Sequence, residues 1–141
     1  MEKKKLPPLR VEVDKVKPLI FGAEYESRMI LDHVITGRED VIQINHGTVK
    51  AGYALGGGTH EEDEIYYILS GKGKLQLNDE IIDIQGGQVI FIPAGCFHAL
   101  DNRGSDEDMC ILTFWRDWRF NDAYETRVKL WGKSFKTVDE D

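Results

Sequence analysis

The stretch GQVIFIPAGCFHALDN, residues 87–102, is the most informative part of this chain. Its four apolar residues at 89–92 end at Pro93, and proline favours the end of a strand because it has no N–H for the sheet ladder. Pro93, an alanine and Gly95 then form a turn signal, and His98 opens a second, mostly apolar segment. The stretch therefore predicts two strands joined by a tight turn, with a histidine at the start of the second strand.

A second stretch, GYALGGGTHEEDEIYYILSG at residues 52–71, contains groups from which a metal site can be built. Three consecutive glycines, separated from His60 by one residue, precede it, and four consecutive acidic residues follow it. If His60 begins a strand, the two-residue period places Glu62, Glu64 and Tyr66 on the same face. Imidazole and carboxylate groups together suit a divalent transition metal. From this stretch alone, the alternative is an acidic, solvated loop with His60 at its rim.

The spacing within these two stretches resembles the two motifs of the cupin superfamily. In the second motif every fixed position matches, at Gly87, Pro93, Gly95, His98 and Asn102. In the first motif the matching positions are Gly52, His60, Glu64 and Gly71. One position departs from the family pattern, because the first of its two histidines falls on Gly58. The two motifs together cover about a quarter of the chain.

The resemblance implies that His60, Glu64 and His98 hold a divalent metal ion, such as iron, manganese, zinc or nickel. Two histidines and one carboxylate form the facial triad of non-haem iron sites, which leaves positions open for substrate. Loss of the fourth ligand leaves two alternatives open. Either the protein no longer binds metal, or Glu61 or Glu62 replaces the missing histidine.

The resemblance also implies an all-β jelly-roll barrel that encloses a small-molecule site. We expect a metalloenzyme that acts on a carboxylate, an enolisable carbonyl or a sugar derivative, as a dioxygenase or as an isomerase, cyclase or lyase. The alternative is a non-catalytic cupin that binds or senses a small molecule. Sensors of this kind are usually fused to a DNA-binding domain, and no helix-turn-helix fits in this chain, so the enzyme is the leading hypothesis.

Three further polar side chains are candidates for acid–base chemistry or anion contact, namely Tyr66, Tyr53 and Arg28. Tyr66 shares the expected inward face with Glu64, and the alternative is a core aromatic. Arg28 lies in an apolar run, where burial is costly unless the guanidinium meets an anion; exposure on the outside of the sheet is the alternative. His33, expected in mid-strand, and His46, expected in a turn, are weaker candidates.

Outside the motifs, short apolar runs with polar interruptions indicate strands. The expected segments are 9–16, 28–35, 41–44, 49–55, 65–69, 74–77, 81–84 and 109–114. Only the segment 121–131 has helical spacing. Its expected apolar face consists of Ala123, Tyr124, Val128 and Trp131. We expect Asn121 or Asp122 to cap its N-terminus and Gly132 to end it.

The length of 141 residues supports one domain over 1–141. We expect an N-terminal arm or strand at 1–20, a motif-bearing barrel core at 52–102 and the C-terminal helix within 121–133. We also expect a homodimer, because small barrels expose edge strands and residues 1–17 include a segment that could pair across a twofold axis. The aromatic run at 114–120 offers apolar area for the same interface.

Charge and cysteine content argue against several classes of function. The formal net charge of −7 disfavours binding to nucleic acid or to an anionic membrane surface. No apolar run is long enough to span a bilayer, and the first residues do not resemble a signal peptide. Two cysteines, Cys96 and Cys110, are too few for a disulfide framework. We therefore expect a cytoplasmic protein with reduced thiols and a small-molecule ligand.

Overall fold

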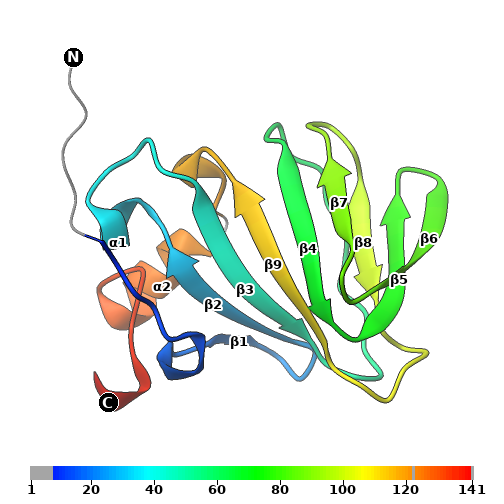
Figure 1. Ribbon diagram of the computed structural model, residues 1–141, viewed down its shortest axis with the longest axis horizontal. Helices are drawn as coiled ribbons and strands as arrows, with labels where there is room; N and C mark the ends of the chain where they lie inside the picture. The colour runs from blue at the N-terminus through cyan, green and yellow to red at the C-terminus, as the bar shows by residue number, and fades with distance from the viewer. Residues whose placement is uncertain (1–7, 122, 141) are drawn as a thin grey trace.

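Within the residues that the computed structural model describes, 8–121 and 123–140, the chain forms two antiparallel sheets (Figure 1). The strands are β1 (Leu19–Phe21), β2 (Tyr25–Leu31), β3 (Gln43–Val49), β4 (Glu64–Ser70), β5 (Lys72–Leu77), β6 (Glu80–Gln85), β7 (Val89–Ile92), β8 (His98–Asp101) and β9 (Met109–Trp115). One sheet has the order β1-β2-β3-β9-β4-β7, and the other has the order β6-β5-β8.

Helices make up a small part of the described residues. They are α1 (His33–Thr36) and α2 (Tyr124–Trp131), and three-residue 3₁₀ turns lie at Val13–Lys15, Trp118–Phe120 and Val138–Glu140. Both helices lie at one end of the molecule, beyond β2 and β3 (Figure 1). No helix in the described part of the chain is long and apolar enough to cross a membrane. The architecture is the all-β jelly roll with a short C-terminal helix that the sequence predicted.

Alternation along the strands separates an inner from an outer face. In β4, Tyr66 and Ile68 are buried, whereas Ile65, Tyr67 and Leu69 are 37–40% exposed. The inner faces of the two sheets share one hydrophobic core. This core includes Val49, Ile68, Ile92, Met109 and Ile111 of the six-stranded sheet and Leu75, Ile84 and Leu100 of the three-stranded sheet.

The turn between β7 and β8 ties two distant segments together. Gly95 has a φ of 82°, a left-handed conformation that glycine adopts without strain. Its N–H donates to the carbonyl of His60 at 2.8 Å, which anchors the loop before β4. At the end of β8, the buried Asn102 side chain donates to the carbonyls of Val49 and Glu107. The turn thus holds the two motif segments against each other, and Asn102 ties the end of β8 to β3 and to the loop before β9.

Four expectations from the sequence are wrong. The segment 49–55 is not a strand beyond Val49, because it has a turn at residues 51–52 and a single bridge from Ala54 to Asp101. The segment 9–16 is not a strand, because it has a 3₁₀ turn and a single bridge from Val16 to Thr137. Residues 1–7 of the expected N-terminal arm lie outside the described residues. His33 does not lie in mid-strand, because the Asp32 carboxylate accepts from two backbone N–H groups and starts α1 there. His46 does not lie in a turn but in β3, opposite Leu112.

The C-terminal helix is shorter than 121–131 and buries a different side chain from those expected. It begins at Tyr124, its cap residue is Ala123, which makes no side-chain cap, and it ends at Gly132 as expected. Asp122, the other expected cap, lies outside the described residues. Arg127 is the buried residue of α2, while Val128 is 37% exposed. The helix therefore packs on the sheet through a cation rather than through an apolar stripe.

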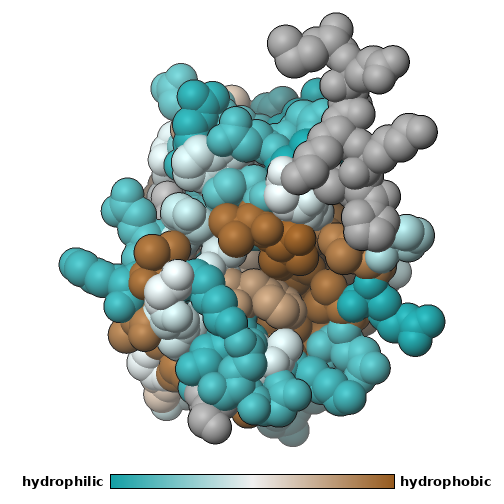
Figure 2. All heavy atoms as spheres, turned by 90° about the vertical axis from the view of Figure 1, so that its left-hand side faces the viewer, coloured by the Kyte–Doolittle hydropathy of each residue, from teal (hydrophilic) through white to brown (hydrophobic). Residues whose placement is uncertain are grey.

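Hydrophobic side chains also reach the surface at the helical end. Figure 2 shows a patch of them there, surrounded by hydrophilic residues. Exposed apolar residues of the segments near this end are Leu9, Val34 and Leu130, each 46–63% exposed. The molecule therefore has apolar surface beyond its core.

Candidate metal centre

Three side chains from separate parts of the chain converge at one end of the inner face. One ligand atom each from His60, Glu64 and His98 lies within 4.8 Å of the other two. Glu64 Oε1 lies 3.2 Å from His98 Nε2 and 3.5 Å from His60 Nε2. The two imidazole rings meet edge to face, with 4.9 Å between their centroids. We call these three residues the His–Glu–His cluster.

Backbone carbonyls fix which ring nitrogen of each neutral imidazole carries the hydrogen. His60 Nδ1 lies 2.8 Å from the carbonyl oxygen of Glu62, and His98 Nδ1 lies 2.9 Å from that of Cys96. A carbonyl oxygen can only accept, so each Nδ1 carries the hydrogen. The Nε2 lone pairs of the neutral rings then point at Glu64. Metal-binding histidines are commonly oriented in this way.

Glu64 has an unsatisfied oxygen that fits a cation. Its Oε1 is buried, and with both imidazoles neutral no described residue donates a hydrogen bond to it. Three electron-rich atoms this close repel one another unless a proton or a metal ion lies between them. A proton on His98 can relieve this repulsion. The hydrogen bond to Glu64 therefore raises the pKa of His98, although partial burial lowers it. The donor set of two nitrogens and one oxygen suits a divalent transition metal.

The backbone around the cluster explains why its residues meet. Glu64 begins β4 and points inward like Tyr66, as the strand alternation predicted. His60 is not in a strand: it lies in the preceding loop, held by the hydrogen bond from Gly95. Gly58 pairs with His98, each N–H donating to the other's carbonyl at 3.1–3.2 Å. This bridge brings the glycine loop onto β8.

The acidic neighbours of the cluster are engaged elsewhere. Glu62 Oε1 accepts from the N–H of Arg116, and Asp63 Oδ1 accepts from the N–H of Ala94. Glu61 is exposed. Among the described residues, His60, Glu64 and His98 form the only group of three or more His, Cys, Asp or Glu side chains placed to share an ion. Replacement of the missing histidine by Glu61 or Glu62 therefore finds no support in the geometry.

Two cavities adjoin the cluster and share Tyr66. The first, the glycine-loop cavity, has a volume of about 320 Å³. It is lined by residues 55–60, Tyr66 and residues 98–100. The second, the helix-side cavity, has a volume of about 280 Å³ and contains Glu64 in its wall. The cluster thus lies where a small ligand has space on two sides.

The structure brings one of the three candidate catalytic residues to the cluster. Tyr66 is buried with its ring 6.1 Å from that of His98, and burial with the nearby Glu64 carboxylate raises its pKa well above 10.0. Tyr53 is 45% exposed and lines neither cavity. Arg28 alternates with the buried Ser27 on β2, so it projects from the outer face.

Arg28 is satisfied on that outer face. Its Nε donates to the carbonyl of Val16 at 3.0 Å, and its Nη1 lies 3.7 Å from Glu26. Arg28 was a candidate because burial of its cation would be costly without an anionic ligand. On the outer face this cost does not arise. His33 stacks on Trp118 at 4.2 Å, and His46 pairs across the sheet with Arg28. Neither histidine belongs to the cluster.

The sequence reasoning missed Tyr25, which lines the helix-side cavity together with Glu64 and Tyr66. Burial raises the pKa of Tyr25, so its hydroxyl stays neutral. The signal in the sequence was the alternation of β2, in which Tyr25 shares a face with the buried Ser27 and Met29. The remaining Cys96 and Cys110 are both free, and neither belongs to the cluster.

Comparisons with known proteins agree with this fold. The family model of the cupin domain matches residues 45–115, which is half of the chain. A protein of Methanocaldococcus jannaschii described as uncharacterized is 28% identical over 69% of this chain and 78% of its own length. Another uncharacterized protein, from Streptomyces coelicolor, is 32% identical over 43% of this chain and 61% of its own length. The matched segment thus spans about three-fifths of the Streptomyces relative.

Solved structures share the fold. A protein of Thermotoga maritima described as a predicted oxalate decarboxylase has a TM-score of 0.68 and 22% identity, with 77% of this chain and 99% of that chain covered. An RmlC-like cupin of Shewanella frigidimarina has a TM-score of 0.65 and 11% identity, with 84% and 98% covered. At these identities the likeness extends to the fold alone. With the family model, the topology and the motif spacing in agreement, the chain belongs to the cupin family.

Proposed function

We propose that this cupin is a metalloenzyme for a small polar substrate, in which His60, Glu64 and His98 hold a divalent ion. The observation that carries the proposal is the buried Glu64 Oε1, which two Nε2 atoms approach and which no described residue satisfies while both imidazoles are neutral. Iron, manganese, zinc and nickel all accept this donor set. The substrate classes that fit are a carboxylate, an enolisable carbonyl and a sugar derivative.

Each residue of the cluster has a defined task. The two imidazoles offer Nε2 because their Nδ1 hydrogens are used by backbone carbonyls. Glu64 supplies the negative charge that a divalent cation requires. When bound, the ion would supply Lewis-acid or redox chemistry at the positions that three protein ligands leave open.

Tyr66 acts in this proposal as a hydrogen-bond donor rather than as a base. Its pKa is raised well above 10.0, first by burial and then by the Glu64 carboxylate. The hydroxyl is therefore protonated at physiological pH. Its hydrogen is shared with Glu64, and it can donate to an oxygen of the substrate when a metal ion holds that carboxylate. It lines both cavities, so it can reach a ligand in either of them.

A non-catalytic cupin that binds or senses a small molecule is the second candidate. The observation that favours it is Gly58, which removes the fourth ligand of the family pattern. A protein of this kind would use the same two cavities and bind its ligand without converting it. Binding without turnover is the outcome that separates the two candidates.

The test is a panel of small carboxylates, enolisable carbonyls and sugar derivatives, incubated with protein loaded with one metal at a time. Proton NMR follows product formation, and an oxygen electrode separates a dioxygenase from an isomerase, cyclase or lyase. Turnover by the wild type and its loss in His98→Ala would support the enzyme. Saturable binding of a panel member with no product for any metal would instead support the binding module.

We also propose a cytoplasmic homodimer. The two free cysteines are in keeping with a reducing compartment. The outer face of β4 and β7 carries contiguous apolar side chains, and β7, which pairs with β4, is an edge strand of its sheet. These side chains are Ile65, Tyr67, Leu69, Val89 and Phe91, each 37–64% exposed. This face is a stronger candidate interface than the N-terminal segment.

A further inference from the structure

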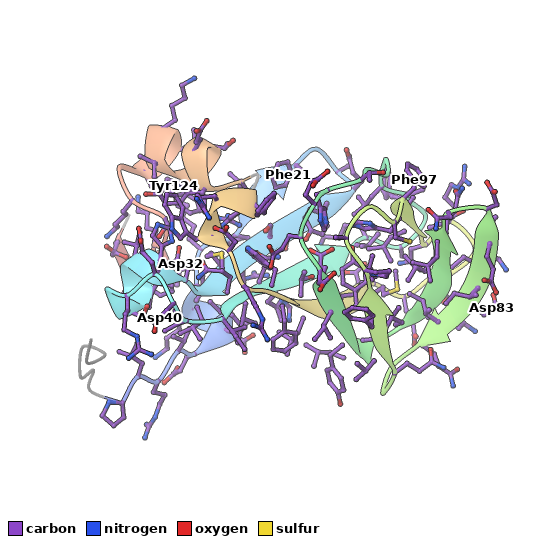
Figure 3. The ribbon with its side chains drawn as sticks, turned by 90° about the horizontal axis from the view of Figure 1, so that it is seen from above. Phe21, Asp32, Asp40, Asp83, Phe97 and Tyr124 are labelled. Atoms are coloured by element: carbon purple, nitrogen blue, oxygen red, sulfur yellow. The ribbon has the colours of Figure 1, made fainter. Side chains whose placement is uncertain are left out.

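The helix-side cavity has a largely polar wall that the metal centre does not explain. It lies on the inner face of the six-stranded sheet, next to the segment that leads into α2. Its polar lining residues are Tyr25, Ser27, Asn45, Glu64, Tyr66, Thr113 and Asn121, and its apolar ones are Phe21, Trp115, Phe120 and Ala123. In Figure 3, Phe21 lies between Tyr124 at the helical end and Phe97 beside the three-stranded sheet.

A buried cation lies behind this wall. Arg127 of α2 is 1% exposed, and its Nη2 donates to Ser27 Oγ at 2.7 Å and to Asn45 Oδ1 at 3.3 Å. Its Nε and Nη1 are also buried and have no hydrogen-bond partner in the described part of the chain. Burial lowers the pKa of Arg127 to about 10, so the group is still charged at neutral pH.

The positive charge of Arg127 is not paired within the described residues. The buried Asp32 carboxylate attracts this charge, but its Oδ1 caps α1, and no ion pair joins it to Arg127 among the described residues. Burial of a cation without an ion-pair partner is unfavourable, and a neutral side chain of similar size would avoid the cost. The charge of Asp32 acts on Arg127 without direct contact, so a second negative charge in the cavity would further lower this cost.

The hydrogen bonds run in one direction, from Arg127 toward the cavity. Ser27 Oγ accepts from Arg127 and donates to Asn45 Oδ1 at 2.7 Å. Asn45 Nδ2 then donates to Tyr25 Oη at 3.4 Å, which leaves the hydroxyl hydrogen of Tyr25 to donate onward. Each donor in such a chain is polarised by the one before it. The chain ends at a wall residue that faces the same cavity as Glu64.

We propose that the helix-side cavity binds the carboxylate group of a small organic acid, with Tyr25 and Asn45 as its hydrogen-bond donors and Arg127 as its buried counter-charge. The inference rests on the proposed function in one respect: Glu64 and Tyr66 line this cavity, so the rest of the acid would lie beside the metal. Glu64 already places a negative charge in this wall, so a singly charged carboxylate is favoured over a phosphate dianion. The volume of about 280 Å³ restricts the ligand to a small molecule.

The test measures binding of propionate and its neutral analogue propionamide by ligand-observed NMR, first in metal-free and then in zinc-loaded protein. We expect wild-type protein to bind propionate at least tenfold more tightly than propionamide. The dissociation constant for propionate should rise at least tenfold in Arg127→Met and severalfold in Tyr25→Phe. Arg103→Met removes an exposed cation of equal charge and should leave binding unchanged. Should Arg127→Met fail to fold, Arg127→Gln, which also removes the charge, and Tyr25→Phe carry the same comparison.

Equal affinity for propionate in wild type, Arg127→Met and Tyr25→Phe would overturn the proposal, as would equal binding of propionamide. Tighter binding of inorganic phosphate than of propionate would overturn the choice of a carboxylate. Zinc titration of the same variants separates this proposal from the metal proposal. Failure to bind zinc contradicts the metal centre but leaves the metal-free comparison valid, whereas normal zinc binding without the Arg127 effect contradicts only the carboxylate site.

Discussion

Gly58 is the residue at which this chain departs from its family, and the structure shows what a side chain there would meet. Gly58 and His98 face each other across an antiparallel bridge, and residues directly opposite in such a pair project to the same side. A Cβ added at Gly58 has no atom within 4 Å, and no left-handed φ opposes it. The position is therefore open on the side of the cluster.

The first prediction restores the missing ligand. Gly58→His should raise the affinity for a divalent transition metal by about tenfold or more, which corresponds to roughly 1.4 kcal/mol. Competition against a colorimetric chelator measures this affinity. Gly104→His is the matched control, because Gly104 is equally open and lies outside the cluster. Equal metal affinity in wild type and Gly58→His would show that position 58 does not face the ion.

The second prediction concerns the proton that competes with the metal at His98. The hydrogen bond to Glu64 raises the pKa of His98 above its ordinary 6.5. In metal-free protein, the resulting stabilisation is fully present below pH 6.5 and is lost as the pH rises through the raised pKa. Metal needs the neutral imidazole, so its stabilisation has the opposite sign and fades as the pH falls.

The measurement is the difference in melting temperature between zinc-loaded and chelated protein, followed from about pH 8.5 to about pH 6. We expect the difference to begin shrinking above pH 6.5, the ordinary value for histidine. His46 does not obscure this window, because burial and Arg28 lower its pKa. A difference that stays constant down to pH 6.5 would contradict the raised pKa.

At the scale of elements, the bridge between the glycine loop and β8 holds the cluster together. The third prediction uses Gly57, where an added Cβ would lie 2.8 Å from the carbonyl oxygen of His98 and 2.4 Å from the Phe97 ring. Gly57→Ala should cost about 1–3 kcal/mol of unfolding free energy and weaken metal binding, since the loop must move away from β8. Urea unfolding checks the stability, and Gly58→Ala, with open space, should stay within about 0.5 kcal/mol. Equal stability of the two variants would contradict the close approach.

Strand alternation and motif spacing made much of this fold predictable. The runs at 65–69, 74–77, 81–84 and 89–92 alternate or end at turn residues, and all four lie in strands. Motif spacing placed His60 and His98 beside Glu64, although His60 reaches it from a loop that only the tertiary contact with Gly95 explains.

The expectations that were wrong depended on contacts between distant segments. His46 follows an asparagine and precedes a glycine, which indicates a turn, yet pairing with β2 and β9 extends it. The pattern singled out Arg28, because it lies in an apolar run, but gave no sign that Arg127 is buried. Only packing shows that Arg28 is satisfied outside the sheet while Arg127 is buried within.

At the scale of the whole molecule, the fourth prediction is the dimer. Light scattering should give a mass of about twice 16.1 kDa at tens of micromolar. Val89→Glu on the outer face of the six-stranded sheet should shift the protein toward monomer, because a charge opposes burial of that face. Ile81→Glu is the matched control, since Ile81 is 62% exposed on the other sheet. A wild type that stays monomeric would contradict the prediction.

The central claim is that His60, Glu64 and His98 hold a divalent ion, and the melting temperature with and without a chelator tests it most directly. Metal that binds only the folded state should stabilise it by roughly 2.7 kcal/mol at a hundredfold excess over the dissociation constant. We predict that chelation lowers the melting temperature, that one transition metal restores it, and that His60→Ala and His98→Ala abolish this response while His33→Ala retains it. A melting curve that neither chelator nor any added metal changes would contradict the claim and favour the non-catalytic binding module.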